Sequence, residues 1–146
     1  MAQTNSTAIV KTVEDVYAKL PALPKGGRDF LYTVAPWVAL IFGILSVLGS
    51  LSAFGLSAVF SPFAAMGGST GFAAQLLIAS ALGVVEGVLM VVSFPSLRKG
   101  VMKGWTLLFW AEVLGIVGSV VLVSVGGVIG GLIGLYLLFQ IKSYYK

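Results

Sequence analysis

Two glutamates are the residues of this sequence whose type and spacing could support chemistry inside an apolar region. Glu86 and Glu112 lie at equal distances in sequence on either side of Lys99, in a stretch from Gly71 to Leu122 that has no other acidic residue. If this stretch folds as an antiparallel helical hairpin that turns near Lys99, both carboxyl groups come to about the same depth. Paired carboxylic acids can share or exchange protons. We therefore treat Glu86 and Glu112 as a candidate intramembrane site for protons, a cation or a docking partner.

An acidic side chain near the centre of a membrane-spanning helix needs a compensating interaction, because its insertion costs roughly 2.5 to 3.5 kcal/mol. No Lys, Arg or His occurs in residues 30–55, 72–94, 105–123 or 128–141, and Lys142 lies at the end of the last apolar segment. Lys103 is the nearest in sequence to Glu112, about 13 Å away along a helix. Three solutions stay open. The carboxyl groups are neutral and hydrogen-bonded, they bind protons or a cation, or they pair with a basic group of another chain. In the first case, the hydrogen-bond partners of the neutral carboxyl groups could be Ser80, Ser93, Ser119 or water.

The composition of the chain is typical of a membrane protein. Of its 146 residues, 58% are hydrophobic and 10% are charged, and the mean hydropathy is +1.04. A soluble domain carries about a quarter charged residues. The net charge of +4 comes from Lys and Arg that flank apolar segments, which is typical of topology signals and not of a nucleic-acid-binding face. We therefore expect the lipid bilayer as the environment and no nucleic-acid partner.

The sequence offers no pattern for catalysis. It contains no Cys and no His, which excludes disulfides and thiolate or imidazole ligands. It also has no glycine-rich dinucleotide or phosphate loop, no zinc-protease motif and no nucleophile elbow. We expect no catalytic residues, no cofactor and no metal site, and we predict that the protein is not an enzyme.

Four apolar segments are predicted to cross the membrane, whose hydrocarbon core of about 30 Å takes around 20 helical residues. They are residues 30–55, 72–94, 105–123 and 128–143. Residues 56–70 combine Ser, Pro and Gly in a composition that disfavours helices, so we expect an exposed loop or a segment that dips back into the bilayer. Pro95 should end the second span, and a tight turn at residues 124–127 should precede the fourth. Because the fourth span is short, a re-entrant hairpin at the C-terminal end is the alternative.

Residues 1–29 are predicted to form a cytoplasmic N-terminal segment with an amphipathic helix, ahead of a transmembrane domain over residues 30–146. Pro21 and Pro24 should follow the end of this helix. It could lie in the membrane interface or pack against the protein's own cytoplasmic face, and we expect the second. Its apolar side consists of Ile9, Val10, Val13, Val16, Tyr17 and Leu20, and its polar side of Lys11, Thr12, Glu14, Asp15 and Lys19.

The distribution of basic residues predicts the orientation. All nine Lys and Arg residues precede the first span, lie between the second and third spans, or lie at or beyond the end of the fourth. The two other connections carry none. Cytoplasmic loops have an excess of Lys and Arg. Four crossings therefore place both termini and the central loop in the cytoplasm, in a multi-pass protein of the cell membrane.

Glycines recur at helical spacing in the predicted spans. Gly83 and Gly87 flank Glu86, and Gly126, Gly130 and Gly134 repeat along the fourth span. Helices in lipid associate through close contact at small residues, because apolar burial does not drive their association there. We therefore predict that these five glycines are helix-packing residues. They could pack within one four-helix bundle or against another subunit, and the same surface would serve either role.

Together these patterns predict an all-α integral membrane protein with four transmembrane helices after an N-terminal amphipathic helix. Small size, glycine-rich faces and the lack of a catalytic pattern favour a non-catalytic accessory or structural subunit of a membrane complex. Its partners would be other membrane subunits or further copies of itself as a homo-oligomer. The alternative is a small proton-coupled or cation transporter that uses Glu86 and Glu112.

Overall fold

The structure is a computed structural model that describes residues 2–68 and 70–146. Its elements are the helices α1 (Ala2–Tyr17), α2 (Lys25–Met66), α3 (Thr70–Arg98), α4 (Met102–Val121) and α5 (Val125–Gln140), followed by the short 3-10 helix η1 (Lys142–Tyr144). No strand occurs in the described ranges, so the all-α prediction is confirmed. α2, α3 and α4 are long and apolar enough to cross a membrane, whereas α5 is apolar but shorter. Ser69, which belongs to the predicted connection over 56–70, lies outside the described residues.

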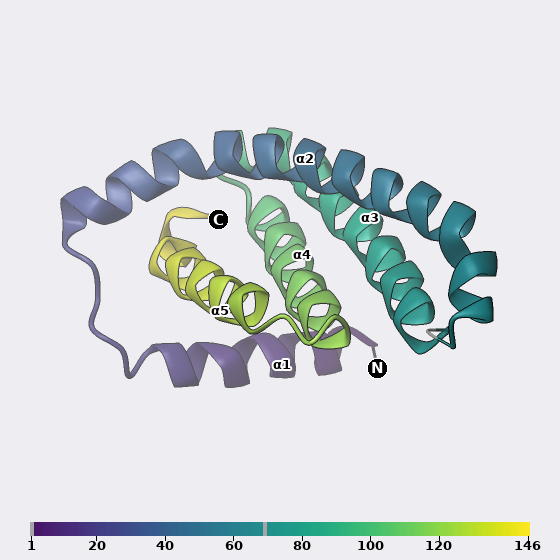
Figure 1. Ribbon diagram of the computed structural model, residues 1–146. Coiled ribbons are helices and arrows are strands. Elements are labelled where there is room, and N and C mark those ends of the chain that lie inside the picture. The colour runs from purple at the N-terminus through teal and green to yellow at the C-terminus, as the bar shows by residue number, and fades with distance from the viewer. Residues whose placement is uncertain (1, 69) are drawn as a thin grey trace.

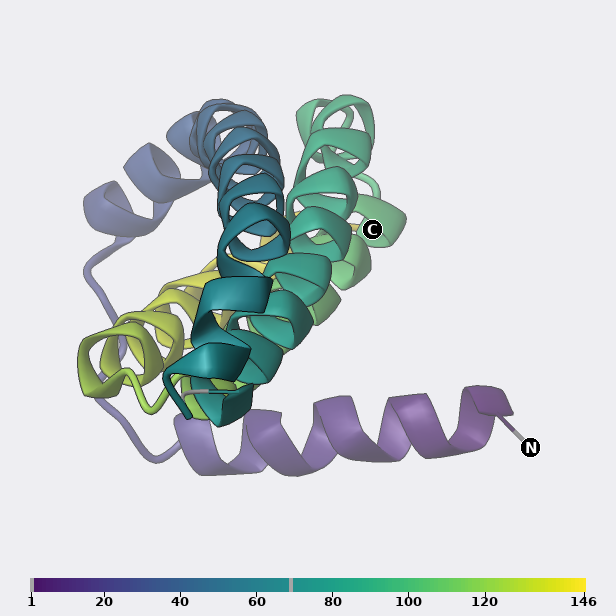
Figure 2. The same cartoon turned by 45° about the vertical axis from the view of Figure 1, so that its right-hand side comes forward.

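Helices α2 to α5 run back and forth, and each packs mainly against the next one in sequence (Figure 1). α3 and α4 therefore form the middle of the bundle, between α2 on one side and α5 on the other. α2 and α5 do not pack extensively on each other. α1 extends away from the bundle and touches it mainly through α5 (Figure 2).

α2 is longer than the sequence pattern indicated. It has 42 residues and ends only at Met66, so the prediction of a loop or re-entrant segment is wrong for residues 56–66. The serines of this stretch are compatible with a helix because their hydroxyls bond to the preceding turn. Ser57 and Ser61 each donate to a backbone carbonyl three residues earlier, at 2.8 and 3.0 Å. The chain turns after Gly67, where Gly68 adopts a φ of 72° that favours glycine.

Two other predicted boundaries are also shifted. α3 continues through Pro95 to Arg98, and the turn to α4 uses Gly100, whose φ is 67°. The last two helices are separated before Val125 and not over 124–127, because Ser124 caps α5 by accepting a hydrogen bond from the N–H of Gly127 at 3.3 Å. With 16 residues, α5 is about 24 Å long.

A glycine contact joins α2 to α3. A Cβ on Gly87 would lie 2.6 Å from the carbonyl oxygen of Gly43, and a Cβ on Gly43 would lie 2.9 Å from the carbonyl oxygen of Gly87. One turn further along, Gly83 faces the side chain of Ser50, and the Ser46 hydroxyl donates a hydrogen bond to the Gly83 carbonyl at 3.0 Å. The two backbones approach this closely only because neither helix carries a side chain at the crossing.

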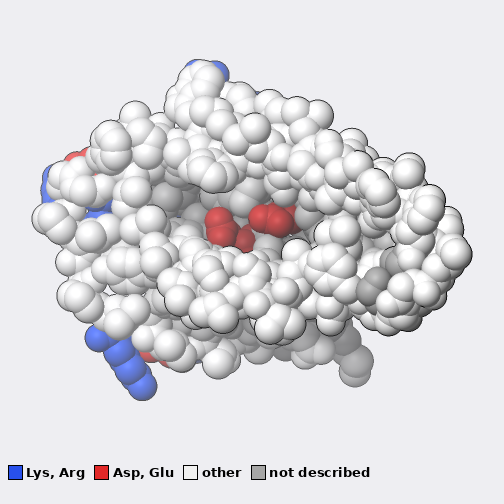
Figure 3. All heavy atoms as spheres, in the orientation of Figure 1, with Lys and Arg blue, Asp and Glu red and all other residues white. Residues whose placement is uncertain are grey.

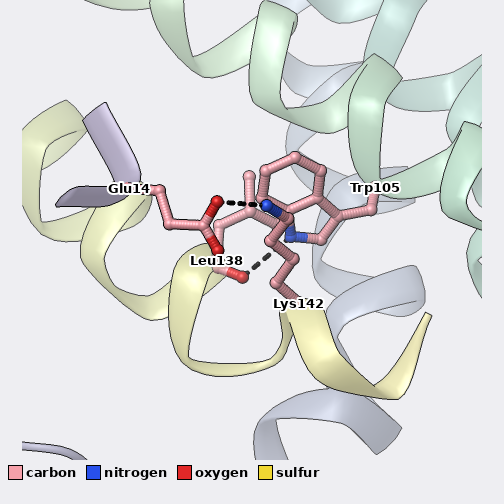
Figure 4. Close-up of polar contacts among 4 residues, drawn as sticks. All are labelled: Glu14, Trp105, Leu138 and Lys142. Carbon is pink, nitrogen blue, oxygen red and sulfur yellow. Dashed lines mark hydrogen bonds and ion pairs between the residues drawn. The ribbon is translucent and has the colours of Figure 1, made fainter. Parts of the chain in front are cut away.

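An aromatic cluster joins α4 to Phe139 of α5. Trp105 and Phe109 are 1% and 0% exposed, and their rings stack at 5.6 Å between centroids. The indole N–H of Trp105 donates a hydrogen bond to the carbonyl oxygen of Leu138 at 2.9 Å, as Figure 4 shows. Because a buried indole N–H needs a partner, this bond sets the register of α4 against the end of α5.

The chain's basic segments gather at one end of the bundle. The N–H of Met102 donates to the carbonyl of Lys146 at 2.7 Å, and the N–H of Lys146 donates to the carbonyl of Gly100 at 3.0 Å. Tyr144 donates a hydrogen bond to the carboxylate of Asp29. The start of α2, the α3–α4 connection and the C-terminus therefore lie together.

α1 is fastened to α5 and η1. Its residue Glu14 forms an ion pair with Lys142 at 2.5 Å, drawn in Figure 4, and the Tyr17 hydroxyl donates to the carbonyl of Leu132 at 3.0 Å. The prediction that this segment is helical is confirmed. Its predicted apolar side is divided, however. Val10, Val13 and Tyr17 pack against the core, whereas Ile9, Val16 and Leu20 are exposed. The bundle covers only the stripe nearest to α5.

The glycine contact between α2 and α3 leads to a stability prediction. Gly87→Ala should destabilise the protein by about 1–3 kcal/mol, because the new methyl group meets backbone that cannot move aside. Gly49→Ala is the matched control on the partner helix, since nothing lies within 4 Å of a Cβ there. Thermal unfolding of both variants in the same detergent measures the difference. Equal melting temperatures would contradict this account of the crossing.

Candidate functional site

Glu86 and Glu112 lie in one cavity in the middle of the bundle. The cavity has a volume of about 660 Å³ and is lined by residues of α2, α3, α4 and α5. Figure 3 shows it as a hollow in the side of the molecule, with acidic atoms at its floor. α3 and α4 carry the two glutamates at the floor, and α2 and α5 form the walls. The two glutamates therefore line one cavity, which the sequence alone does not establish.

Each carboxyl group lies against a glycine of the next helix. A Cβ on Gly115 of α4 would lie 2.7 Å from Oε1 of Glu86, and a Cβ on Gly134 of α5 would lie 2.6 Å from Oε2 of Glu112. Both carboxyl groups thus have the same kind of neighbour, since a glutamate of one helix packs against a glycine of the next helix. Any larger residue at Gly115 or Gly134 would push the carboxyl group away from its present position.

The two glutamates differ in depth by about one helical turn. Glu86 is level with Gly115, which lies three residues after Glu112, a rise of about 4.5 Å along α4. The equal spacing from Lys99 therefore predicts the depth only approximately. The reason is that the turn between α3 and α4 is centred beyond Lys99, at Gly100 and Val101. The carboxyl groups are still close enough to interact electrostatically.

The three serines proposed as bridges form no hydrogen bond to the glutamates in the described residues. Each donates its hydroxyl to a backbone carbonyl of its own helix: Ser80 to Leu76 at 2.7 Å, Ser93 to Met90 at 2.7 Å, and Ser119 to Gly115 at 2.9 Å. In the part of the chain that the structure describes, no hydrogen bond or ion pair compensates Glu86 or Glu112. In the described residues, both half-buried carboxyl groups are therefore without a compensating positive charge.

The basic residues lie elsewhere. Lys103 is exposed at the start of α4, and Lys142 is held by Glu14 at 2.5 Å. Arg98 lies over the rings of Trp37 and Phe94, 5.5 and 5.7 Å from their centroids. No Lys or Arg of the described residues lines the cavity. The cavity therefore combines two acidic groups with no internal counter-charge.

The walls of the cavity are almost wholly apolar. Among its lining residues, the only polar side chains besides the two glutamates belong to Ser119. The lining consists of Leu31, Val34, Ala35, Val38, Ala39, Phe42, Glu86, Met90, Leu108, Glu112, Gly115, Ser119, Gly127, Gly130, Gly131, Ile133, Gly134, Leu137, Leu138 and Ile141. The described residues contain no group of three or more Asp or Glu that could hold a metal ion. Two carboxyl groups in such a setting can exchange protons or attract a positive charge.

The five glycines predicted to pack helices have different surroundings. Gly83 and Gly87 lie at the α2–α3 contact, and Gly134 lies against Glu112. Nothing lies within 4 Å of a Cβ on Gly126 or Gly130. The glycines that pack α5 against α4 are the neighbouring row, Gly127 against Ser119 and Gly131 against Ile116. The sequence shows both rows equally, and only the rotation of α5 about its axis separates them.

Sequence reasoning missed two parts of the site. The walls come from α2 and α5, which are far from the glutamates in sequence and carry no polar signal at these positions. Gly115 and Gly134 were visible as helix glycines, but their contact with carboxyl groups depends on which face each helix presents.

Comparison with known proteins gives no relative for this arrangement. No protein-family model, curated protein sequence or solved structure matches the chain.

Proposed function

We propose that this protein is a small membrane transporter that exchanges a cation for protons, with Glu86 and Glu112 as the exchange site. The observation that carries the proposal is the position of both carboxyl groups at the floor of one apolar cavity that no basic side chain of the described residues enters. Of the two functions expected from the sequence, this geometry favours the transporter. A purely structural subunit has no need of uncompensated acidic groups in a cavity.

The exchange follows from the electrostatics of the cavity. Without a cation, a neutral protonated carboxyl group avoids the cost of an unpaired charge in apolar surroundings. A bound cation compensates the negative charge, so the carboxyl group can ionise and release its proton. One proton leaves for each positive charge that binds. Because Glu86 and Glu112 interact, the pair should titrate as a coupled unit and not as two independent acids.

The proposal includes four membrane crossings with both termini and the α3–α4 connection in the cytoplasm. It is supported by the gathering of the basic segments at one end of the bundle, through the contacts of Met102, Lys146 and Tyr144. It is also supported by the positive-inside rule. α5 covers about 24 Å of the roughly 30 Å core, and η1 continues the chain toward the basic end.

Neutral replacements of the glutamates test the exchange. Proteoliposomes that contain a pH dye are challenged in turn with alkali-metal and organic cations. At least one cation should drive proton release in the native protein. Glu86→Gln and Glu112→Gln should each reduce this flux to the level of protein-free liposomes, because the exchangeable proton is lost. Asp15→Asn, a change on the exposed side of α1, is the matched control and should keep the flux. Retained flux in both Gln variants would remove the proposal.

Single cysteines test the orientation, in a chain that has none of its own. Met66→Cys at the end of α2, where the side chain is 88% exposed, should react with an impermeant maleimide added outside the cell. Lys99→Cys, at the other end of α3, should react only after the membrane is opened. Labelling of Lys99→Cys in intact cells would contradict the proposed orientation.

A second candidate function is the accessory subunit of a membrane complex. It is favoured by the open glycine row of α5, where Gly126 and Gly130 have no neighbour within 4 Å of a Cβ and Val125 and Ile129 are 69% and 53% exposed. A second helix could approach closely along this row.

The particle extracted from the native membrane in mild detergent tests this second function. For an accessory subunit, it should contain fixed, unrelated membrane proteins, and Gly126→Leu should release the chain from them. Gly55→Leu is the control, since its position on α2 is equally open, and it should leave the particle unchanged. A particle built of this chain alone would count against the accessory role.

A further inference from the structure

The cavity has two chemically different surfaces, and together they define a ligand. Its floor carries Glu86 and Glu112, and its walls are formed by apolar side chains and glycines of α2 and α5. We propose that the ligand is an organic cation with a hydrophobic body, which enters sideways from the membrane between α2 and α5. This inference rests on the proposed exchange site and adds the class of its substrate and the route of entry.

Charge complementarity selects a cation. Two acidic side chains face the cavity, and no basic side chain in the described ranges does so. An anion would find no positive charge there, because the remaining lining is apolar apart from the hydroxyl of Ser119, which already donates to the carbonyl of Gly115. A positive group at the floor would lie near both carboxyl groups at once.

The size and polarity of the cavity favour an organic ion over a metal ion. Its volume of about 660 Å³ falls within the range of about 300–1,000 Å³ typical of sites for drug-sized molecules. A hard metal cation such as Ca²⁺ takes about six to eight oxygen ligands, and the floor offers two carboxyl groups and one hydroxyl. Apolar walls offer no ligand atoms to a metal ion, but they can cover the hydrophobic body of an organic cation.

The mouth of the cavity lies on the side of the bundle. α2 and α5 border the hollow and do not pack extensively on each other. Figure 3 shows the hollow in the orientation of Figure 1, in which the helices are seen from the side. At this mouth the lining residues Val38, Phe42 and Ile133 are 46%, 60% and 53% exposed. In a bilayer these residues face lipid, where a hydrophobic cation accumulates and a bare metal ion does not.

Binding to the purified full-length protein in detergent tests the ligand class. The probe is tetraphenylphosphonium, and tetraphenylborate has the same shape and the opposite charge. Equilibrium dialysis should show binding of the phosphonium and no comparable binding of the borate. Tetramethylammonium, which carries the charge without the hydrophobic body, should bind at least about tenfold more weakly than tetraphenylphosphonium, since it leaves the apolar walls uncovered.

Variants locate the probe. Glu86→Gln and Glu112→Gln should each weaken binding of tetraphenylphosphonium by at least about tenfold. Gly130→Leu should weaken it by a similar factor without changing any charge, because Gly130 lines the cavity and a leucine there would occupy its volume. Gly126→Leu is the matched control, one turn away on α5 and outside the lining. It should bind as the native protein does.

The outcomes separate this inference from the proposed exchange. Equal binding of the phosphonium and the borate, or unchanged phosphonium binding in Glu86→Gln, Glu112→Gln and Gly130→Leu, would overturn the ligand class and the site. If alkali-metal ions drive proton flux but the phosphonium does not bind, the exchange stands and the ligand class is wrong. If the phosphonium binds with the expected dependence but no cation drives proton flux, the ligand class stands and the transport function fails. Should one Gln variant not fold, the Gly130→Leu and Gly126→Leu pair still decides the location.

Discussion

Close approach of helices at glycine is the constraint on which the rest of the structure depends. In lipid, apolar burial does not hold helices together, so van der Waals contact between backbones must do so. Gly43 and Gly87 bring α2 and α3 into backbone contact. Gly115 and Gly134 have a second role. Because neither has a side chain, a glutamate carboxyl group of the neighbouring helix fits against each of them. The same residue type thus both joins the helices and holds the acidic site in place.

The cavity exists because the helices pack in sequence order and do not close into a ring. α3 and α4 are each covered on two sides, whereas α2 and α5 border the cavity and have little contact with each other. Side-chain contacts between segments far apart in sequence lie near one end, where Trp105 donates to the carbonyl of Leu138 and Lys142 pairs with Glu14. The side of the bundle between α2 and α5 stays open, as the proposed lateral entry of a ligand requires.

Much of the fold follows from composition and periodicity. The all-α class, the apolar spans near 72–94 and 105–123 and the helix within residues 1–29 agree with the structure. The prediction failed where composition was a poor guide to backbone geometry. Ser57 and Ser61 donate hydrogen bonds to carbonyls of their own helix, so α2 continues to Met66. Residue frequencies do not describe such local hydrogen bonds, and the predicted end of the first span was therefore too early.

The sequence by itself pointed to the two acidic residues of the candidate site, because an acidic residue in an apolar span is costly wherever it lies. Glu86 and Glu112 are visible on that ground alone. Only the tertiary structure decided that they share a cavity, that Ser80, Ser93 and Ser119 donate to their own helices instead, and that α2 and α5 supply the walls. These facts depend on the rotation of each helix about its axis. That rotation is set by contacts between segments far apart in the chain, and no local pattern encodes it.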